Sequence, residues 1–83
     1  MTQKEQIDYA AKLLHITSDD ALKYHTIIEE EKLIYVSVPE KGGMSIIVGE
    51  DGSVLFADSS IGYSKHLSEY KNGRRTPIEQ FGI

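Results

Sequence analysis

Two short apolar segments, Met44–Val48 and Ser53–Ala57, lie on either side of the pair Asp51-Gly52. This pattern restricts the possible folds more than any other feature of the sequence. An Asp-Gly pair between apolar segments favours a tight hairpin, because a type I′ turn needs a positive φ at both central residues. We therefore predict a β-hairpin in which Asp51 and Gly52 are the two turn residues.

The turn also predicts which side chains of the hairpin share a face. One face is expected to hold four apolar residues, Ile46, Val48, Leu55 and Ala57. Ile47 and Phe56 then lie on the other face. A sheet with one solvated side alternates apolar and polar residues, and this hairpin does not. Both faces therefore need a cover. We expect the N-terminal helix to cover one face, and the C-terminal segment, a second subunit or another protein to cover the other.

The N-terminal segment has the spacing of an amphipathic helix from Gln3 to about Ile16. Its main apolar stripe consists of Ile7, Ala10, Ala11 and Leu14. The apolar arc covers more than half of the helix circumference.

A second helix is predicted from Gly62 to Asn72, because Gly73 follows at the position where helices commonly end. Its apolar stripe consists of Tyr63, His66, Leu67 and Tyr70. We interpret Asp58, Ser59 and Ser60 as capping residues before this helix.

Between the two helices the apolar period changes to two, which predicts four strands at about residues 24–29, 33–38, 44–48 and 53–57. A polar turn is expected at residues 30–32 and a loop at residues 39–43. The sequence thus predicts a single α+β domain, residues 1–83. It has an N-terminal helix, a four-stranded antiparallel β-meander and a C-terminal helix (α-β-β-β-β-α) in two layers.

Composition argues against several classes of function. The formal net charge is −4 and the pI is about 5.2, whereas binders of nucleic acid or anionic membranes need a positive field. No apolar run approaches the ~18 residues that a membrane span requires. The N-terminus lacks the apolar core of a secretory signal, and the chain has no cysteine. We expect a cytoplasmic protein with no membrane contact.

Catalytic and metal-binding patterns are not found in the sequence. His15, His25 and His66 lie on three different predicted elements, so we expect no metal site. Asp58 and His66 could belong to a Ser/His/Asp set by residue type alone. The nucleophile-elbow pattern that such a set needs is absent, so we do not expect a catalytic triad. The glycines at residues 42–43 and 49–52 match no phosphate or dinucleotide fingerprint, and we expect no cofactor.

A local basic patch follows the second predicted helix, formed by Lys65, Lys71, Arg74 and Arg75. Arginine forks bind carboxylates and phosphates bidentately, so the patch suits phosphate or an acidic protein surface. Cations at a helix C-terminus are also favoured by the helix dipole without any partner. Both interpretations stay open.

Our leading functional hypothesis is a non-enzymatic protein-interaction module that self-associates or binds a protein partner. Its candidate partner-binding residues are Ile47, Phe56, Lys71, Arg74 and Arg75. The alternative is a small enzyme or ligand-binding protein with a helix-sheet pocket, and its candidate pocket residues are Tyr63, His66 and Tyr70. The sequence specifies no small-molecule ligand, and its charge argues against nucleic acid.

Overall fold

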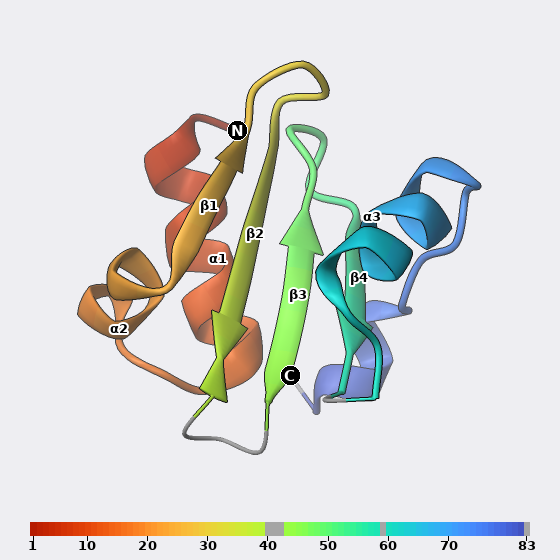
Figure 1. Cartoon of the computed structure of the whole chain (residues 1–83). Helices are drawn as coiled ribbons and strands as arrows, with labels where there is room; N and C mark the ends of the chain where they lie inside the picture. The colour runs from red at the N-terminus through yellow and green to blue at the C-terminus, as the bar shows by residue number, and fades with distance from the viewer. Residues whose placement is uncertain (40–42, 59, 83) are drawn as a thin grey trace.

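The computed structural model describes residues 1–39, 43–58 and 60–82 (Figure 1). In chain order it contains helices α1 (Gln3–Leu14) and α2 (Ser18–Lys23), strands β1 (His25–Ile28), β2 (Leu33–Val38), β3 (Met44–Val48) and β4 (Val54–Ala57), helix α3 (Tyr63–Lys71) and the 3₁₀ helix η2 (Ile78–Phe81). The strands form one antiparallel sheet in the order β1-β2-β3-β4. The predicted α+β class and the α-β-β-β-β-α order are confirmed. Residues 40–42, Ser59 and Ile83 lie outside the described residues.

Helix α1 begins at a capping box. Thr2 Oγ1 accepts a hydrogen bond from the Glu5 N–H (3.2 Å), and Glu5 Oε1 accepts one from the Thr2 N–H (2.8 Å). These bonds satisfy donors that have no partner within the helix. At the other end, the C-cap residue His15 has a φ of 58° and turns the chain out of the helix. The predicted apolar stripe of α1 is buried.

A buried glutamine ties α1 to the sheet. The side chain of Gln6 is 2 % exposed. Its Nε2 donates hydrogen bonds to Lys32 O (3.0 Å) in the β1–β2 turn and to Val48 O (2.9 Å) at the end of β3. Because both N–H groups of the amide are used, this polar group is buried without an unpaired donor.

The β3–β4 turn differs from the predicted one. Its loop has three residues, 50–52, because the Gly49 N–H bonds to Ser53 O (2.8 Å) and the Gly52 N–H bonds to Gly49 O (3.0 Å). Of the two expected turn residues, Gly52 has a positive φ (84°) and Asp51 does not. This is the three-residue hairpin loop that ends in a left-handed glycine, so the predicted two-residue type I′ turn is wrong.

The longer loop shifts the predicted register by one residue. Ile47 pairs with Leu55, and Ile46 pairs with Phe56. Since neighbouring residues of a strand point to opposite faces, the shift brings Leu55 to the face of Ile47 and Phe56 to the face of Ile46. Both faces of the hairpin remain apolar, as the sequence predicts.

The chain itself covers both faces of the sheet. We call the cluster beneath α1 the α1-face core; its sheet residues are Ile34, Val36, Val38, Ile46, Val48 and Val54. The α3-face core lies on the other side and contains Leu33, Ile47 and Tyr70, with Ile28, Tyr35, Leu55 and Leu67 at its margin. Figure 1 shows α3 in front of the sheet and α1 behind it. The sheet is therefore a middle layer, and the expected two layers become three.

Asp58 and Ser60, the two expected capping residues that the structure describes, do not cap α3. Asp58 Oδ1 accepts hydrogen bonds from the N–H (2.9 Å) and the hydroxyl (2.5 Å) of Ser60, which closes a local turn. The N-cap of α3 is Gly62, which has no capping side chain. After the helix, Gly73 has a φ of 95° and ends α3 at the predicted place.

The segment after α3 protects one edge of the sheet. The Thr76 N–H donates to Val54 O (2.8 Å), and the Phe56 N–H donates to Thr76 Oγ1 (2.9 Å). The chain then reaches the α1-face core, where the Phe81 ring packs edge-to-face on Phe56 at a centroid distance of 6.0 Å. In the part of the chain that is described, no helix combines the length and the apolar character that a membrane crossing needs.

Candidate functional site

The site is built around Tyr70 in the last turn of α3. Tyr70 is 7 % exposed, and its hydroxyl lies 2.6 Å from Ser53 Oγ, just before β4. The Tyr70 hydroxyl passes beside Gly49, where a Cβ atom would overlap it. A glycine at residue 49 is therefore needed for this close approach.

The guanidinium of Arg75 lies over the ring of Tyr70. Its guanidinium carbon is 3.6 Å from the ring centroid. Nη1 donates hydrogen bonds to Tyr70 O and Arg74 O, each at 2.7 Å. The ring contact and the two carbonyls fix the plane of the guanidinium, so little conformational freedom is left to lose when it binds a ligand.

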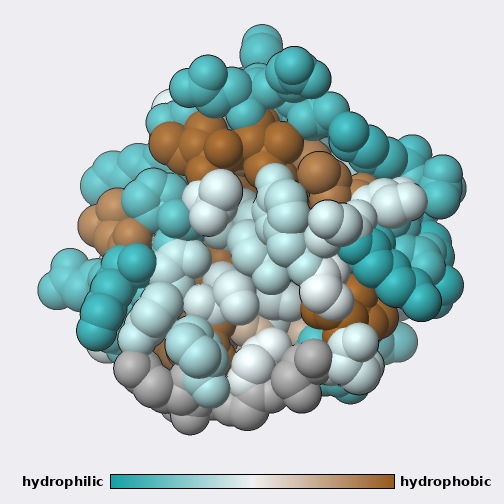
Figure 2. Space-filling view, in the orientation of Figure 1, coloured by the Kyte–Doolittle hydropathy of each residue, from teal (hydrophilic) through white to brown (hydrophobic). Residues whose placement is uncertain are grey.

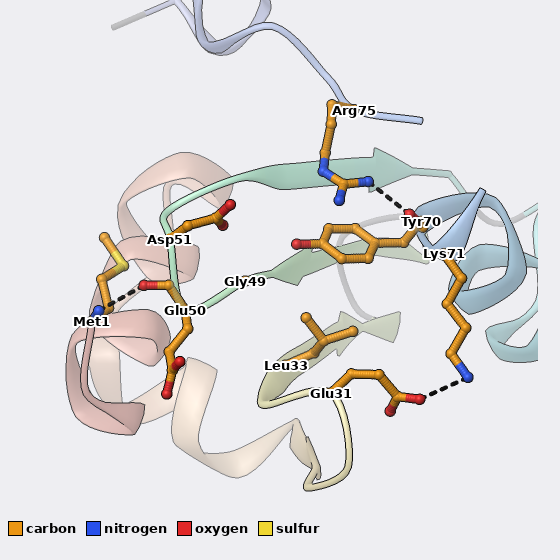
Figure 3. A pocket seen from close by; sticks show the side chains of 9 residues that line it. All are labelled: Met1, Glu31, Leu33, Gly49, Glu50, Asp51, Tyr70, Lys71 and Arg75. Carbon is orange, nitrogen blue, oxygen red and sulfur yellow. Dashed lines mark hydrogen bonds and ion pairs between the residues drawn. The ribbon is translucent and has the colours of Figure 1, made fainter. Parts of the chain in front are cut away.

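A cleft opens beside this pair, with a volume of about 790 Å³. It lies where the β1–β2 turn, the β3–β4 turn and the end of α3 meet (Figure 3). The lining residues are Met1, Glu31, Leu33, Gly49, Glu50, Asp51, Tyr70, Lys71 and Arg75. The buried side chain of Leu33 supplies apolar surface to the cleft. The cleft is open to solvent and combines apolar surface with charged groups.

Charged groups of both signs line the cleft. On one side Lys71 Nζ forms an ion pair with Glu31 (2.8 Å), and this carboxylate raises the pKa of Lys71. On the other side Asp51 accepts hydrogen bonds from the Ser53 hydroxyl (2.7 Å) and N–H (2.9 Å). These bonds, the hydroxyl first, lower the pKa of Asp51, and Arg75 adds a smaller effect in the same direction. The Asp51 carboxylate is thus charged at neutral pH.

Arg75 differs from Lys71 in having no described carboxylate within ion-pair distance, and Asp51 acts on it only as a weak electrostatic neighbour. The described part of the chain contains ion pairs at Lys4–Asp8, Lys71–Glu31 and Arg74–Glu69, and none at Arg75. A guanidinium has five N–H groups. Two of them, both on Nη1, reach backbone carbonyls. The remaining three, on Nε and Nη2, are the donors with which arginine binds a carboxylate side-on.

His66, on the buried side of α3, lies outside the cleft. It is 1 % exposed. Nε2 donates to Leu55 O (2.7 Å), because a carbonyl can only accept, and Nδ1 lies 3.1 Å from the Ser45 hydroxyl. Burial lowers the pKa of His66, and the bond to Leu55 O opposes this effect in part. The Ser45–His66 contact resembles a nucleophile and its base, but both side chains are sealed from solvent.

The three candidate pocket residues do not share a cavity. Tyr70 lines the cleft. His66 borders a separate cavity of about 80 Å³. Tyr63 is 41 % exposed and packs edge-to-face on Tyr35, with ring centroids 4.8 Å apart. The structure therefore places Tyr63, His66 and Tyr70 on one helix but at different sites.

The five candidate partner-binding residues are also divided. Lys71 and Arg75 meet at the cleft. Arg74 points to Glu69, with 3.6 Å between Nη1 and Oε2. Ile47 is completely buried beneath α3, and Phe56 is half-buried on the opposite face of the sheet. Ile47 is therefore not accessible to a partner, whereas Phe56 keeps part of its side chain exposed.

Sequence reasoning missed the residues that complete the cleft: Met1, Glu31, Leu33, Gly49, Glu50 and Asp51. Their positions, far from α3 in the chain, give no signal of a shared site. The spacing of Tyr70 and Arg75 shows only that both are near the end of one helix, and it does not show their stacking.

Comparisons with known proteins identify no relative: no family model, curated protein or solved structure matches this chain.

Proposed function

We propose that this protein is a non-enzymatic protein-interaction module, and that its cleft holds an acidic segment of a partner protein. The observation that carries this proposal is the state of Arg75. Its guanidinium is held in place by Tyr70 and two carbonyls, and it has no carboxylate partner among the residues that the structure describes. A carboxylate from outside the chain fits the unused Nε and Nη2 donors.

The form of the cleft favours a chain segment as the ligand. An enclosed metabolite site buries most of its ligand, whereas this cleft is wide and open. Met1, which is 44 % exposed, supplies apolar surface beside charged groups of both signs, whereas Leu33 and Tyr70 are 4 % and 7 % exposed and add little. An apolar centre with a charged rim is the usual arrangement of a protein-binding surface.

The carboxylates around the cleft restrict which acidic segments can bind. Glu50 and Asp51 repel a ligand that carries negative charge throughout. A segment with one acidic residue and an apolar or basic neighbour meets Arg75, Leu33 and Glu50 with complementary groups. We therefore expect mixed sequences to bind better than polyacidic ones.

The small-enzyme alternative receives less support. Among the described residues, Ser45 and His66 form the serine–histidine contact, and both are buried without access from the cleft. No group of three His, Asp or Glu side chains in the described chain is arranged to hold a metal ion.

A peptide-display selection on the immobilised chain tests the proposal. Selected peptides should contain Asp or Glu beside an apolar residue. Calorimetry should show that they bind Arg75→Ala about 10- to 100-fold more weakly than wild type, because a charge-assisted pair of hydrogen bonds is lost. Arg75→Lys should recover only part of the affinity, because lysine lacks the planar fork. Lys65→Ala is the matched control, since Lys65 is an exposed cation of α3 outside the cleft.

Peptides in which Gln replaces the acidic residue should bind wild type no more tightly than the acidic peptides bind Arg75→Ala. Urea unfolding of each variant separates lost binding from lost folding. If the selected peptides bind wild type and a folded Arg75→Ala equally well, the cleft is not an acidic-segment site and the proposal fails.

A further inference from the structure

The cleft also contains a carboxylate of this chain, Asp51, close to Arg75. Both residues line the cleft, and the guanidinium is the weakest of the influences that lower the pKa of Asp51. The backbone brings the two segments side by side, because Thr76, the residue after Arg75, donates to Val54 O beside the Asp51 turn. No ion pair joins Asp51 to Arg75 in the part of the chain that is described. The contacts of Asp51 explain why.

Ser53 holds the Asp51 carboxylate within the turn. Its hydroxyl (2.7 Å) and its N–H (2.9 Å) both donate to Asp51 Oδ1. The hydroxyl bond is the largest of the causes that lower the pKa of Asp51. Because a carboxylate can only accept, the single hydrogen of the Ser53 hydroxyl is used in this bond. Ser53 therefore determines where the carboxylate points.

Tyr70 connects this turn to Arg75. Its hydroxyl lies 2.6 Å from Ser53 Oγ. Since the Ser53 hydrogen is directed to Asp51, the Tyr70 hydroxyl is the donor in this contact. The face of the same ring holds the guanidinium of Arg75, 3.6 Å from the centroid. In Figure 3 Arg75 lies above the Tyr70 ring and Asp51 lies beyond its hydroxyl, so one tyrosine supports both charged groups and separates them.

A second turn has the same local arrangement without an arginine. Asp58 Oδ1 accepts hydrogen bonds from the hydroxyl and the N–H of Ser60, as Asp51 Oδ1 does from those of Ser53. Within the described residues, no cation is among the causes that lower the pKa of Asp58. The Asp58 turn is therefore an internal control for the Asp51 turn.

We propose that Ser53 is a positioning residue of the cleft: its hydroxyl holds the Asp51 carboxylate away from Arg75 and so keeps the guanidinium available to a partner. Without that hydroxyl, Asp51 forms an ion pair with Arg75, and the chain occupies its own site. The exchange between Asp51 and Arg75 is a property of the free protein, whereas its consequence for binding rests on the proposed function.

The exposure of Asp51 and the geometry of arginine favour this exchange. Asp51 is exposed, and its turn lies at the top of Figures 1 and 2, at the end where teal surface surrounds a brown patch. Because the side chain is in solvent, hydrogen bonds fix its direction more than packing does. In Ser53→Ala a single backbone N–H remains as its donor, whereas Arg75 offers two charge-assisted donors, on Nε and Nη2.

NMR titration of the carboxyl carbons in the free protein tests the exchange. In the wild-type background, Arg75→Ala should raise the pKa of Asp51 only slightly, because Arg75 is a minor influence there. In the Ser53→Ala background the same substitution should raise the pKa of Asp51 much more, because Arg75 is then the ion-pair partner. Ser53→Cys, with its weaker donor, should show the same dependence to a smaller degree.

Ser60→Ala is the matched control for this titration. It removes the same hydroxyl bond from a turn without an arginine, so the pKa of Asp58 should rise towards its ordinary value. Adding Arg75→Ala should not change the pKa of Asp58 further. Equal effects of Arg75→Ala on the pKa of Asp51 in the wild-type and Ser53→Ala backgrounds would overturn the inference.

Peptide binding tests the consequence for the cleft. The probe is the tightest acidic peptide from the display selection, with acetylated and amidated ends. Ser53→Ala should bind it about 3- to 5-fold more weakly than wild type, because an exposed ion pair must first be broken. Adding Asp51→Asn should restore the affinity, and Ser53→Thr, which keeps the hydroxyl, should bind as wild type does.

Asp51→Asn also reduces the repulsion of an acidic peptide, so its effect is compared in two backgrounds. The gain in affinity should be larger in Ser53→Ala than in wild type. Equal gains, or a folded Ser53→Ala that binds the peptide as tightly as wild type, would contradict the role of Ser53. A selection that yields no acidic peptide would contradict the proposed function, and the titration would still decide whether Ser53 keeps Asp51 from Arg75.

Discussion

At the scale of single residues, the contacts that form the cleft depend on an absent side chain at Gly49. The Tyr70 hydroxyl occupies the space of a Cβ there, and Asp51 Oδ1 and Ser53 Oγ lie 2.9 Å from the same point. Because three polar groups meet at this point, any added atom must displace at least one of them. The Arg75 guanidinium packs on the Tyr70 ring, so a shift of that ring also changes the cleft.

We predict that Gly49→Ala lowers the free energy of unfolding by about 1–3 kcal/mol, the usual cost of an overpacked site. Urea denaturation of four proteins checks this: wild type, Gly49→Ala, Tyr70→Phe and the double variant. The alanine should cost less in the Tyr70→Phe background, because the displaced hydroxyl is gone. Equal costs in both backgrounds would show that the Tyr70 hydroxyl is not the obstacle.

His66 makes the stability depend on pH. Its pKa is lowered in the folded protein by burial, whereas the unfolded chain has the ordinary value of about 6.5. Below about pH 6.5 the unfolded chain therefore binds a proton that the folded protein does not bind, until the pH reaches the folded pKa. Over that window the stability falls as the pH falls, and above it the stability is fully retained.

We predict that wild type loses stability as the pH falls from about 7, by at most about 1.4 kcal/mol per pH unit for one proton. His66→Gln should be less stable than wild type at neutral pH, but its stability should change less over the same range. Chemical denaturation at several pH values checks both statements. Asp51 and Asp58 do not contribute to the loss of stability in this pH range, because hydrogen bonds from Ser53 and Ser60 lower their pKa values from 3.8. Parallel pH profiles for the two proteins would contradict the prediction.

At the scale of elements, the sequence specifies where strands and turns lie better than it specifies how they are aligned. The apolar segments and the Asp51-Gly52 pair correctly predict the β3–β4 hairpin. The loop length is not predictable from them, since a left-handed glycine suits a two-residue and a three-residue loop. The deciding contacts include Ser53 with Tyr70, 17 residues away in the sequence. An element that packs from a distance therefore helps to select the register.

Strand β4 depends on a side chain outside the sheet for one of its hydrogen bonds. We predict that Thr76→Val lowers the free energy of unfolding by about 1 kcal/mol, because the Phe56 N–H loses its acceptor while the side-chain volume is kept. Thr26→Val makes the same chemical change at an exposed position of β1 and should stay within about 0.5 kcal/mol of wild type. Thermal unfolding at low protein concentration checks the pair. Similar losses for both variants would contradict a role of the Thr76 hydroxyl.

At the scale of the whole molecule, the sequence predicts that both faces of the sheet need a cover, and the chain provides both covers. The α1-face core is predictable because the stripe of α1 and the alternation of the strands are local patterns. The cleft is not, because Glu31, Gly49 and Arg75 come together only when both hairpins and α3 are in place. Lys71 and Arg75 could be identified from the sequence as a basic patch, but their different states, paired and unpaired, could not.

The C-terminal segment contributes to the stability of the whole fold. We predict that Phe81→Ala lowers the free energy of unfolding by about 1–2 kcal/mol, less than the 3–5 kcal/mol typical of a fully buried phenylalanine, because Phe81 is half-exposed. For a domain of this size each 1 kcal/mol lowers the Tm by about 4–8 °C. Gln80→Ala, at an exposed neighbour, is the control. An unchanged Tm for Phe81→Ala would mean that η2 contributes nothing to the core.

The cover that Thr76 places over β4 also sets a limit on growth. A sheet with two open edges can accept another chain on each side, and such addition can continue into a fibril. Because the Val54 and Phe56 backbone groups are already bonded to Thr76, another chain cannot pair with β4 unless it displaces this segment. The cover therefore closes one of the two edges at which such addition could begin.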